Sequence, residues 1–137
     1  MKTFLLCILG IGALVFIGIQ FIPVQKTNPA VEVAVKWDSD RTRELFYRSC
    51  ADCHSHETRW PWYSHIAPAS WLVASHVRDG RLDMNISMPG EVDSDEAAHQ
   101  IRKGEMPPAD YLLMHPDARL TESEKKELIS GLEKTFP

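Results

Sequence analysis

The chain opens with a long apolar stretch. Residues 4–24 contain one clearly polar side chain, Gln20, and Lys2 is the only charged residue before residue 25. A helix rises 1.5 Å per residue, so this stretch would span about 30 Å, the thickness of the hydrocarbon core of a bilayer. Cleavable signals have a shorter apolar core that ends in a small-x-small site. The pattern predicts an uncleaved transmembrane helix, or signal anchor, over residues 1–25, with cleavage near Pro29-Ala30 as the alternative.

After the apolar stretch, the chain divides into a short segment of mixed polarity and a longer region with helical periodicity. Residues 26–37 predict an extended tether, and residues 38–137 predict one domain in which polar caps precede apolar positions at helical spacing. Gly80 and Gly104 are expected close to the ends of two helices, and Thr121 with Glu124 forms a capping box for the last. Prolines interrupt residues 60–68, and residues 82–92 are expected to be a loop. No stretch predicts a sheet, so the fold class is all-α, with four short helices over residues 40–53, 69–77, 94–103 and 122–134.

The charge of the chain narrows the class of partner. It carries 15 basic and 19 acidic residues, a net charge of −4, and nearly all of them follow the apolar stretch. An acidic domain is a poor ligand for nucleic acid and is compatible with a basic protein partner. We therefore expect a protein partner and no nucleic acid.

The most informative motif is residues 50–54, Cys-Ala-Asp-Cys-His. Cys50 and Cys53 are three residues apart and share one face of a helix, so both can reach the vinyl groups of one porphyrin. His54 follows at once and can ligate the iron from the proximal side. The motif predicts one covalently attached haem c.

Other uses of a Cys-x-x-Cys pair are less well supported. A structural zinc site would need two more ligands, and the third cysteine, Cys7, lies inside the apolar stretch. A thioredoxin-like redox pair would need a strand before the motif, whereas residues 41–49 predict an amphipathic helix.

The opposite face of the haem needs a distal ligand, and Met106 is the expected one. It precedes Pro107, which favours extended backbone at Met106 and would hold its thioether in place. Met88 also precedes a proline and is the competing candidate. Packing in the core is the alternative role for either methionine, and the remaining candidate ligands are His65, His76, His99 and His115.

Axial ligation and the surroundings of the haem bear on function. Ligation by histidine and methionine fills both axial positions and suits electron transfer, whereas an open distal site would bind peroxide or a gas. Trp60, Trp62 and Trp71 are expected to line the haem pocket, unless they form an ordinary aromatic core.

Charge and chemistry together predict the location. Lys2 favours a cytoplasmic N-terminus, and covalent haem is attached on the outer side of the bacterial inner membrane. We expect a single-pass protein of that membrane with its haem domain in the periplasm.

Several blocks of sequence resemble the small bacterial haem-binding domain family of c-type cytochromes, over about residues 38–135. The most specific block is Trp-Pro-Trp-Tyr-Ser at residues 60–64. The resemblance implies one covalent haem, a mostly helical cytochrome-c-like fold, an envelope location and Met106 as distal ligand. The other blocks that carry it are residues 50–55, 66–72, 104–108, 111–113, 115–116 and 120–121.

The motif, the axial ligands and the apolar stretch together leave one expected function and two alternatives. We expect a membrane-anchored monohaem cytochrome that passes electrons to a redox partner in the periplasm, and not an enzyme. The alternatives are a haem peroxidase or gas/redox sensor with an open distal site, and a thiol oxidoreductase or metal chaperone that uses Cys50 and Cys53.

Overall fold

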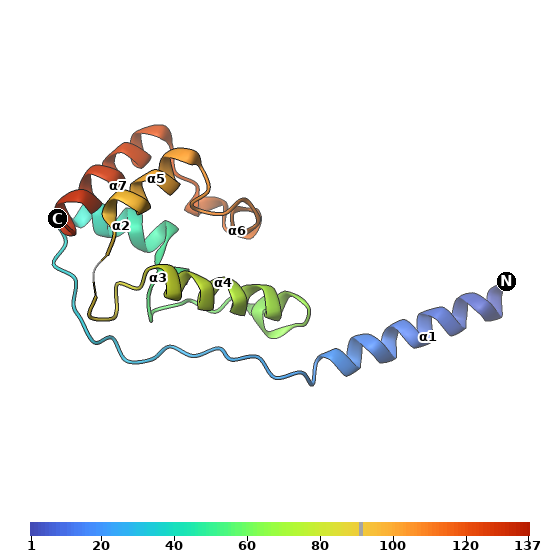
Figure 1. Ribbon diagram of the computed structural model, residues 1–137. Coiled ribbons are helices and arrows are strands. Elements are labelled where there is room, and N and C mark those ends of the chain that lie inside the picture. Colours follow the sequence, from blue (N-terminus) through green and yellow to red (C-terminus); the bar gives the residue numbers. More distant parts are fainter. Residues whose placement is uncertain (91) are drawn as a thin grey trace. The chain divides into compact units, whose positions relative to one another are not determined.

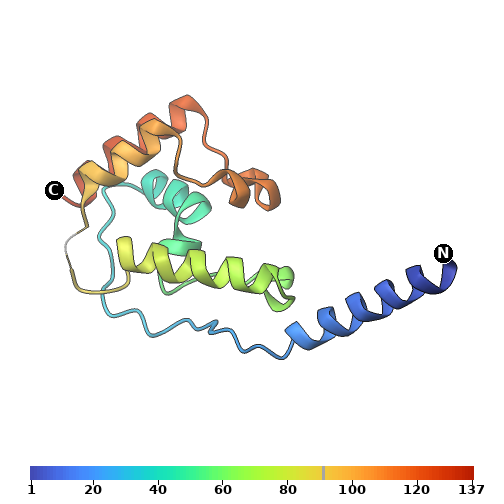
Figure 2. The same cartoon turned by 45° about the vertical axis from the view of Figure 1, so that its right-hand side comes forward.

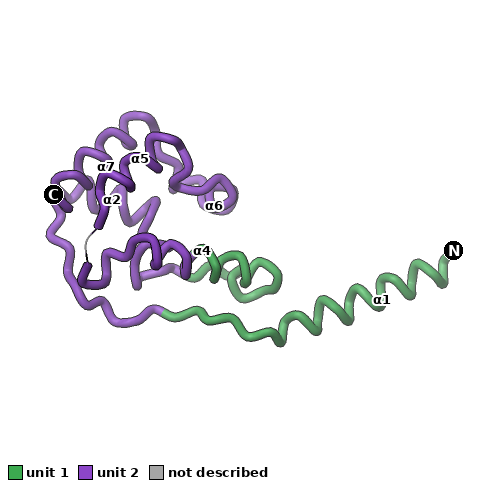
Figure 3. The backbone as a smooth tube through the Cα atoms, in the orientation of Figure 1, with its two compact units in different colours: residues 1–27, 60–76 green, residues 28–59, 77–137 purple. Residues whose placement is uncertain are grey.

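The computed structural model describes residues 1–90 and 92–137, and the regular elements in those residues are all helical (Figure 1). The all-α prediction is thereby confirmed for this part of the chain. The chain divides into two compact units (Figure 3). Unit 1 comprises residues 1–27 and 60–76, and unit 2 comprises residues 28–59 and 77–137. The domain boundaries expected from sequence, 1–25, 26–37 and 38–137, stay predictions.

Unit 1 contains the N-terminal helix α1 (Lys2–Ile19), which has no buried residue. Within the described residues, α1 is the one helix that is long and apolar enough to cross a membrane, with a mean hydropathy of 2.3. The short helix η1 (Trp62–His65) and the first part of α4 (Ala69–Asp83) complete the unit. The chain leaves α1 and passes beside the loop that contains η1, as Figures 1 and 2 both show.

Unit 2 contains the other helices. They are α2 (Asp40–Ser49), α3 (Ala51–His54), the end of α4, α5 (Ser94–Lys103), α6 (Ala109–Met114), η2 (Pro116–Ala118) and α7 (Glu122–Thr135). Local signals explain several of their ends. Ser39 and Asp93 cap α2 and α5 by accepting hydrogen bonds from backbone amides, and Gly104 ends α5 in the left-handed region at φ 77°. The predicted capping box of Thr121 and Glu124 opens α7.

The hydrophobic core of unit 2 lies where α2, α5 and α7 meet. Leu45, Phe46, Leu128 and Leu132 are fully buried there, and each such side chain stabilises the fold by about 1.5–3 kcal/mol. Helices α2 and α7 also approach each other closely, because a Cβ on Gly131 would overlap the side chain of Thr42.

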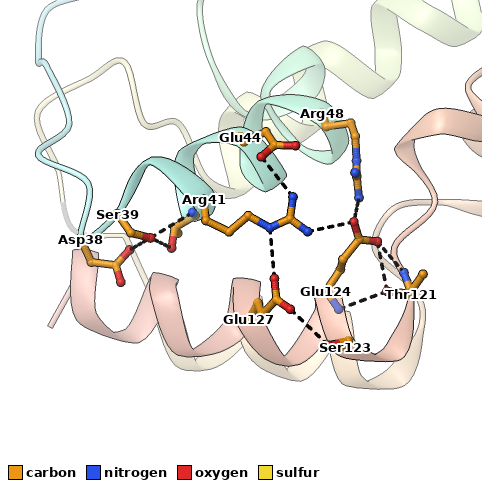
Figure 4. A network of polar contacts seen from close by, with 10 residues as sticks. Asp38, Ser39, Arg41, Glu44, Arg48, Thr121, Ser123, Glu124 and Glu127 are labelled. Atoms are coloured by element: carbon orange, nitrogen blue, oxygen red, sulfur yellow. Dashed lines mark hydrogen bonds and ion pairs between the residues drawn. The ribbon is translucent and has the colours of Figure 1, made fainter.

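Ion pairs reinforce the contact between α2 and α7 (Figure 4). Arg41 lies 3.2 Å from Glu124 and 3.1 Å from Glu127, and Arg48 lies 2.7 Å from Glu124. Glu124 also accepts a hydrogen bond from the Thr121 amide. One carboxylate thus both caps α7 and binds α2.

The predicted tether is extended, and its second half is bound to unit 2. The amides of Glu32 and Val33 donate to the carbonyl of Ser87 at 2.8 and 3.3 Å. Trp37 then packs against the rings of Phe46 and Phe136, with centroids 5.2 and 6.1 Å away. Residues 28–37 therefore belong to the packed structure of unit 2.

Three helices differ from their predictions. The first breaks at Cys50, so the motif residues that follow occupy a separate turn, α3. Helix α4 continues through Gly80 to Asp83, and α6 was not predicted. The loop predicted over residues 82–92 therefore begins after Asp83, and its residue Glu91 lies outside the described residues.

Candidate functional site

The two motif cysteines flank one tight helical turn. The Cys50 amide still bonds the Phe46 carbonyl of α2 at 2.8 Å, but its φ of −128° ends that helix. The amides of Cys53 and His54 both donate to the Cys50 carbonyl, at 3.1 and 3.0 Å. Residues three and four apart on such a turn share a face. Both cysteines are free, so this short segment carries two unbridged thiols next to the His54 imidazole in sequence.

The thiols are held in their neutral form. Burial raises the pKa of Cys50 to about 12 and that of Cys53 to about 11. Reactive cysteines of oxidoreductases have lowered pKa values instead. Among the described residues, no group of three or more His, Cys, Asp or Glu side chains could hold a metal ion. The raised pKa values of the two thiols therefore differ from those of a reactive redox pair.

His54 is buried and oriented by the backbone. Its Nδ1 lies 3.1 Å from the carbonyl oxygen of Met84, and burial lowers the pKa of the ring, which is therefore neutral near pH 7. A proton on Nδ1 donates to this carbonyl and leaves a lone pair on Nε2. Histidines that ligate metals are commonly fixed in this way through their second nitrogen. The role of His54 as the proximal ligand stays a prediction, and its burial and its contact with Met84 agree with it.

Helix α4 lies directly against the motif. A Cβ on Gly80 would come within 2.9 Å of both the Cβ and the carbonyl oxygen of Cys53. Only a glycine permits this approach, which explains why Gly80 lies inside the helix and not at its end.

The second residue between the cysteines, Asp52, is a buried anchor. Its carboxylate accepts hydrogen bonds from the Arg59 guanidinium, at 3.1 Å to each oxygen, and from the Tyr111 hydroxyl at 2.8 Å. The Arg59 amide adds a bond of 2.9 Å, and Thr58 bonds the Asp52 carbonyl at 2.7 Å. Arg59 supplies the charge that a buried carboxylate needs. Asp52 thereby ties the motif turn to α6.

The segment after the motif is fixed by polar contacts as well. Arg81 of α4 donates to the Ser55 carbonyl at 2.8 Å and to the Thr58 hydroxyl at 2.9 Å. His56 lies between the Ala30 carbonyl and the Asn85 amide, at 2.8 and 2.9 Å.

The candidate distal methionines differ in their surroundings. Met106 is half-buried and packs against the core of unit 2, just after the Gly104 stop. Its amide and that of Glu105 point to the Gln100 carbonyl. Met88 is exposed. The choice of Met106 stays a prediction, and its burial agrees with both a ligand and a core role.

A family model provides independent support. The model described as a haem-binding domain matches residues 14–134. The chain belongs to this haem-binding domain family. The match covers the motif, Met106 and the Trp-Pro-Trp-Tyr-Ser block, and it confirms the family expected from the sequence. No curated protein and no solved structure matches the chain significantly.

The three tryptophans expected around the haem lie in unit 1, while the motif lies in unit 2. Trp62 is 72 % exposed, Trp71 is exposed as well, and Trp60 is half-buried. Their role as pocket residues stays a prediction.

Five residues that shape the site were not predicted from the sequence. Asp52 lies between the cysteines, but its role could not be predicted because its partners Arg59 and Tyr111 lie 7 and 59 positions further along the chain. Gly80 carried the signal of a helix end. No local pattern marked Met84, because it acts through its backbone carbonyl.

Proposed function

We propose that this chain is a membrane-anchored c-type cytochrome with one haem, which carries electrons in the bacterial periplasm. Membership of the haem-binding domain family supports the cofactor. The single observation that carries the proposal is the geometry of the Cys-x-x-Cys-His turn, where both cysteines are free and the buried His54 ring has its Nδ1 3.1 Å from the Met84 carbonyl. This donor set fits a covalent haem better than it fits a zinc ion or a redox disulfide.

The residues have distinct roles in this proposal. Cys50 and Cys53 would hold the haem through thioether bonds, and His54 would ligate its iron through Nε2. Met106 would supply the second ligand to the iron. When bound, the haem supplies a one-electron couple between ferric and ferrous iron, and histidine–methionine ligation raises its potential. The carbonyl of Met84 keeps the His54 ring in place in both oxidation states.

The anchor and the charge complete the proposal. Helix α1 spans the inner membrane, with Lys2 on the cytoplasmic side. The acidic residues of the remaining chain favour encounter with a redox partner that carries a basic surface.

The test is to produce the full chain in a host competent in cytochrome maturation. Mass spectrometry is expected to show the added mass of one haem, and the visible spectrum is expected to be low-spin and six-coordinate in both oxidation states. Cys53→Ser should lose one thioether bond, whereas Cys7→Ser, which changes the cysteine outside the motif, should retain the full spectrum. A colourless wild-type protein would contradict the proposal. Rapid carbon monoxide binding to the reduced protein would favour a gas sensor or peroxidase instead.

A further inference from the structure

The loop that precedes α4 is attached to the chain where it leaves α1. The side chain of Gln20 bonds the backbone of Ala67 twice, accepting from its amide at 2.9 Å and donating to its carbonyl at 3.2 Å. A few residues later, Lys26 donates to the Ser64 carbonyl at 2.9 Å and lies 2.7 Å from Nδ1 of His65. Within unit 1, residues 60–68 are thus fixed at the C-terminal end of α1 (Figures 1 and 3).

This arrangement gathers large apolar side chains at that end of the helix. The backbone beneath them is ordered, since Ser64, Ala67 and Ser70 are buried. The side chains themselves are exposed, and we call the set the apolar collar: Phe21, Ile22, Trp62, Ile66, Trp71 and Leu72.

The charge of unit 1 differs sharply from that of the rest of the chain. None of the 19 acidic residues falls in residues 1–27 or 60–76, and the lysines there are Lys2 and Lys26. A surface without carboxylates avoids repulsion from anionic lipid headgroups. Tryptophan and lysine are also the residues that favour the boundary between lipid and water.

We propose that the apolar collar lies in the interfacial layer of the bilayer that α1 spans, where lipid headgroups and the upper acyl chains cover it. The inference rests on the membrane anchoring proposed above. The collar is continuous with α1, because Phe21 and Ile22 directly follow that helix and Gln20 bonds the loop that carries the other collar residues. The collar would hold unit 1 on the lipid surface and would fix the depth of α1. Trp62 and Trp71 then act as membrane anchors.

The experiment uses the full-length holoprotein at one copy per lipid nanodisc of phosphatidylethanolamine and phosphatidylglycerol. A lipid-soluble aryl diazirine is photolysed in the discs, and labelled peptides are mapped by mass spectrometry. We expect label on α1 and on residues 62–72. Hydroxyl radicals generated in the water phase should oxidise Trp62 slowly, despite its 72 % exposure.

A variant pair sharpens the test. Trp62→Asp places a carboxylate in the collar and is expected to remove the label from residues 66–72 while α1 keeps it. Leu113→Asp makes the same charge change at an 80 % exposed residue of unit 2 and should leave that label unchanged.

The possible outcomes test the apolar collar and the membrane anchoring of α1 separately. A labelled α1 with unlabelled residues 62–72 and rapidly oxidised Trp62 would overturn the collar and leave the anchor intact. An unlabelled α1 would overturn both. Protection of Trp62 only in discs that hold two copies would assign the collar to contact between copies and overturn the lipid assignment.

Discussion

The hydroxyl of Tyr111 donates a 2.8 Å hydrogen bond to the carboxylate of Asp52. Asp52 lies between the two motif cysteines, and Tyr111 lies in α6, five residues after Met106. Burial and the adjacent carboxylate raise the pKa of Tyr111, so the hydroxyl keeps its proton. One hydrogen bond therefore connects the turn proposed to hold the haem with the segment proposed to supply its distal ligand.

Tyr111→Phe is expected to lower the free energy of unfolding by about 1–2 kcal/mol, because a half-buried carboxylate contact loses its donor while Arg59 remains. Urea unfolding measures this loss. The control is Tyr47→Phe, which removes a similar bond of 2.6 Å to the exposed Glu57. An equal loss in the two variants would contradict the anchoring role of Asp52.

Gly80→Ala is expected to destabilise the fold by about 1–3 kcal/mol, since the added methyl group would collide with the backbone of Cys53. In an ordinary helix interior the same change stabilises by up to about 1 kcal/mol, so the sign is diagnostic. Thermal unfolding and the yield of haem-loaded protein provide the readouts. Gly90→Ala, where no atom lies within 4 Å of the new methyl group, should change neither.

Met106→Ala is expected to abolish the long-wavelength charge-transfer band of histidine–methionine ligation and to lower the reduction potential, because the iron loses its thioether ligand. The oxidised spectrum and a redox titration measure these changes. Met88→Ala should retain the band, as its side chain is exposed. The reverse result would transfer the distal role to Met88.

Acid should weaken the contact between α2 and α7. The Thr121 amide and then Arg48 lower the pKa of Glu124 from 4.5 to about 2. A lowered folded-state pKa adds stability that is complete above 4.5 and is lost as the pH falls through about 2.

Glu124→Gln should therefore lose stability at neutral pH and show a shallower acid dependence than the wild type between 4.5 and about 2. Urea midpoints across that window test this expectation. Glu133→Gln, which removes an ion pair to Arg102 that is exposed on both sides, is the control and should follow the wild-type slope. Parallel slopes for wild type and Glu124→Gln would contradict the role of Glu124.

Local chemistry made much of unit 2 predictable. The capping box at Thr121 and the Gly104 stop each act within one turn, and both helices have the expected ends. The Cys-x-x-Cys-His motif is equally local. Helix α6 was missed because it has only six residues and no side-chain cap at Pro108. Gly80 was expected near a helix end, but it lies inside α4 because it packs against Cys53. No local sequence pattern indicates this contact.

The apolar collar shows what the tryptophan content of a sequence cannot predict. A run of tryptophans signals burial somewhere, but composition alone does not separate a cofactor pocket from a lipid surface. The hydrogen bonds of Gln20 to Ala67, 47 residues apart, decide which segment the aromatic loop accompanies.

The bound half of the tether has a practical consequence for protein production. Within residues 28–37, the amides of Glu32 and Val33 donate to Ser87, and Trp37 packs against Phe46 and Phe136. A water-soluble version made for crystallisation or electrochemistry should therefore start at or before Asn28. A version that starts at Asp40, the first residue of α2, would lose the half-buried Trp37 ring and leave Phe46 and Phe136 without that contact.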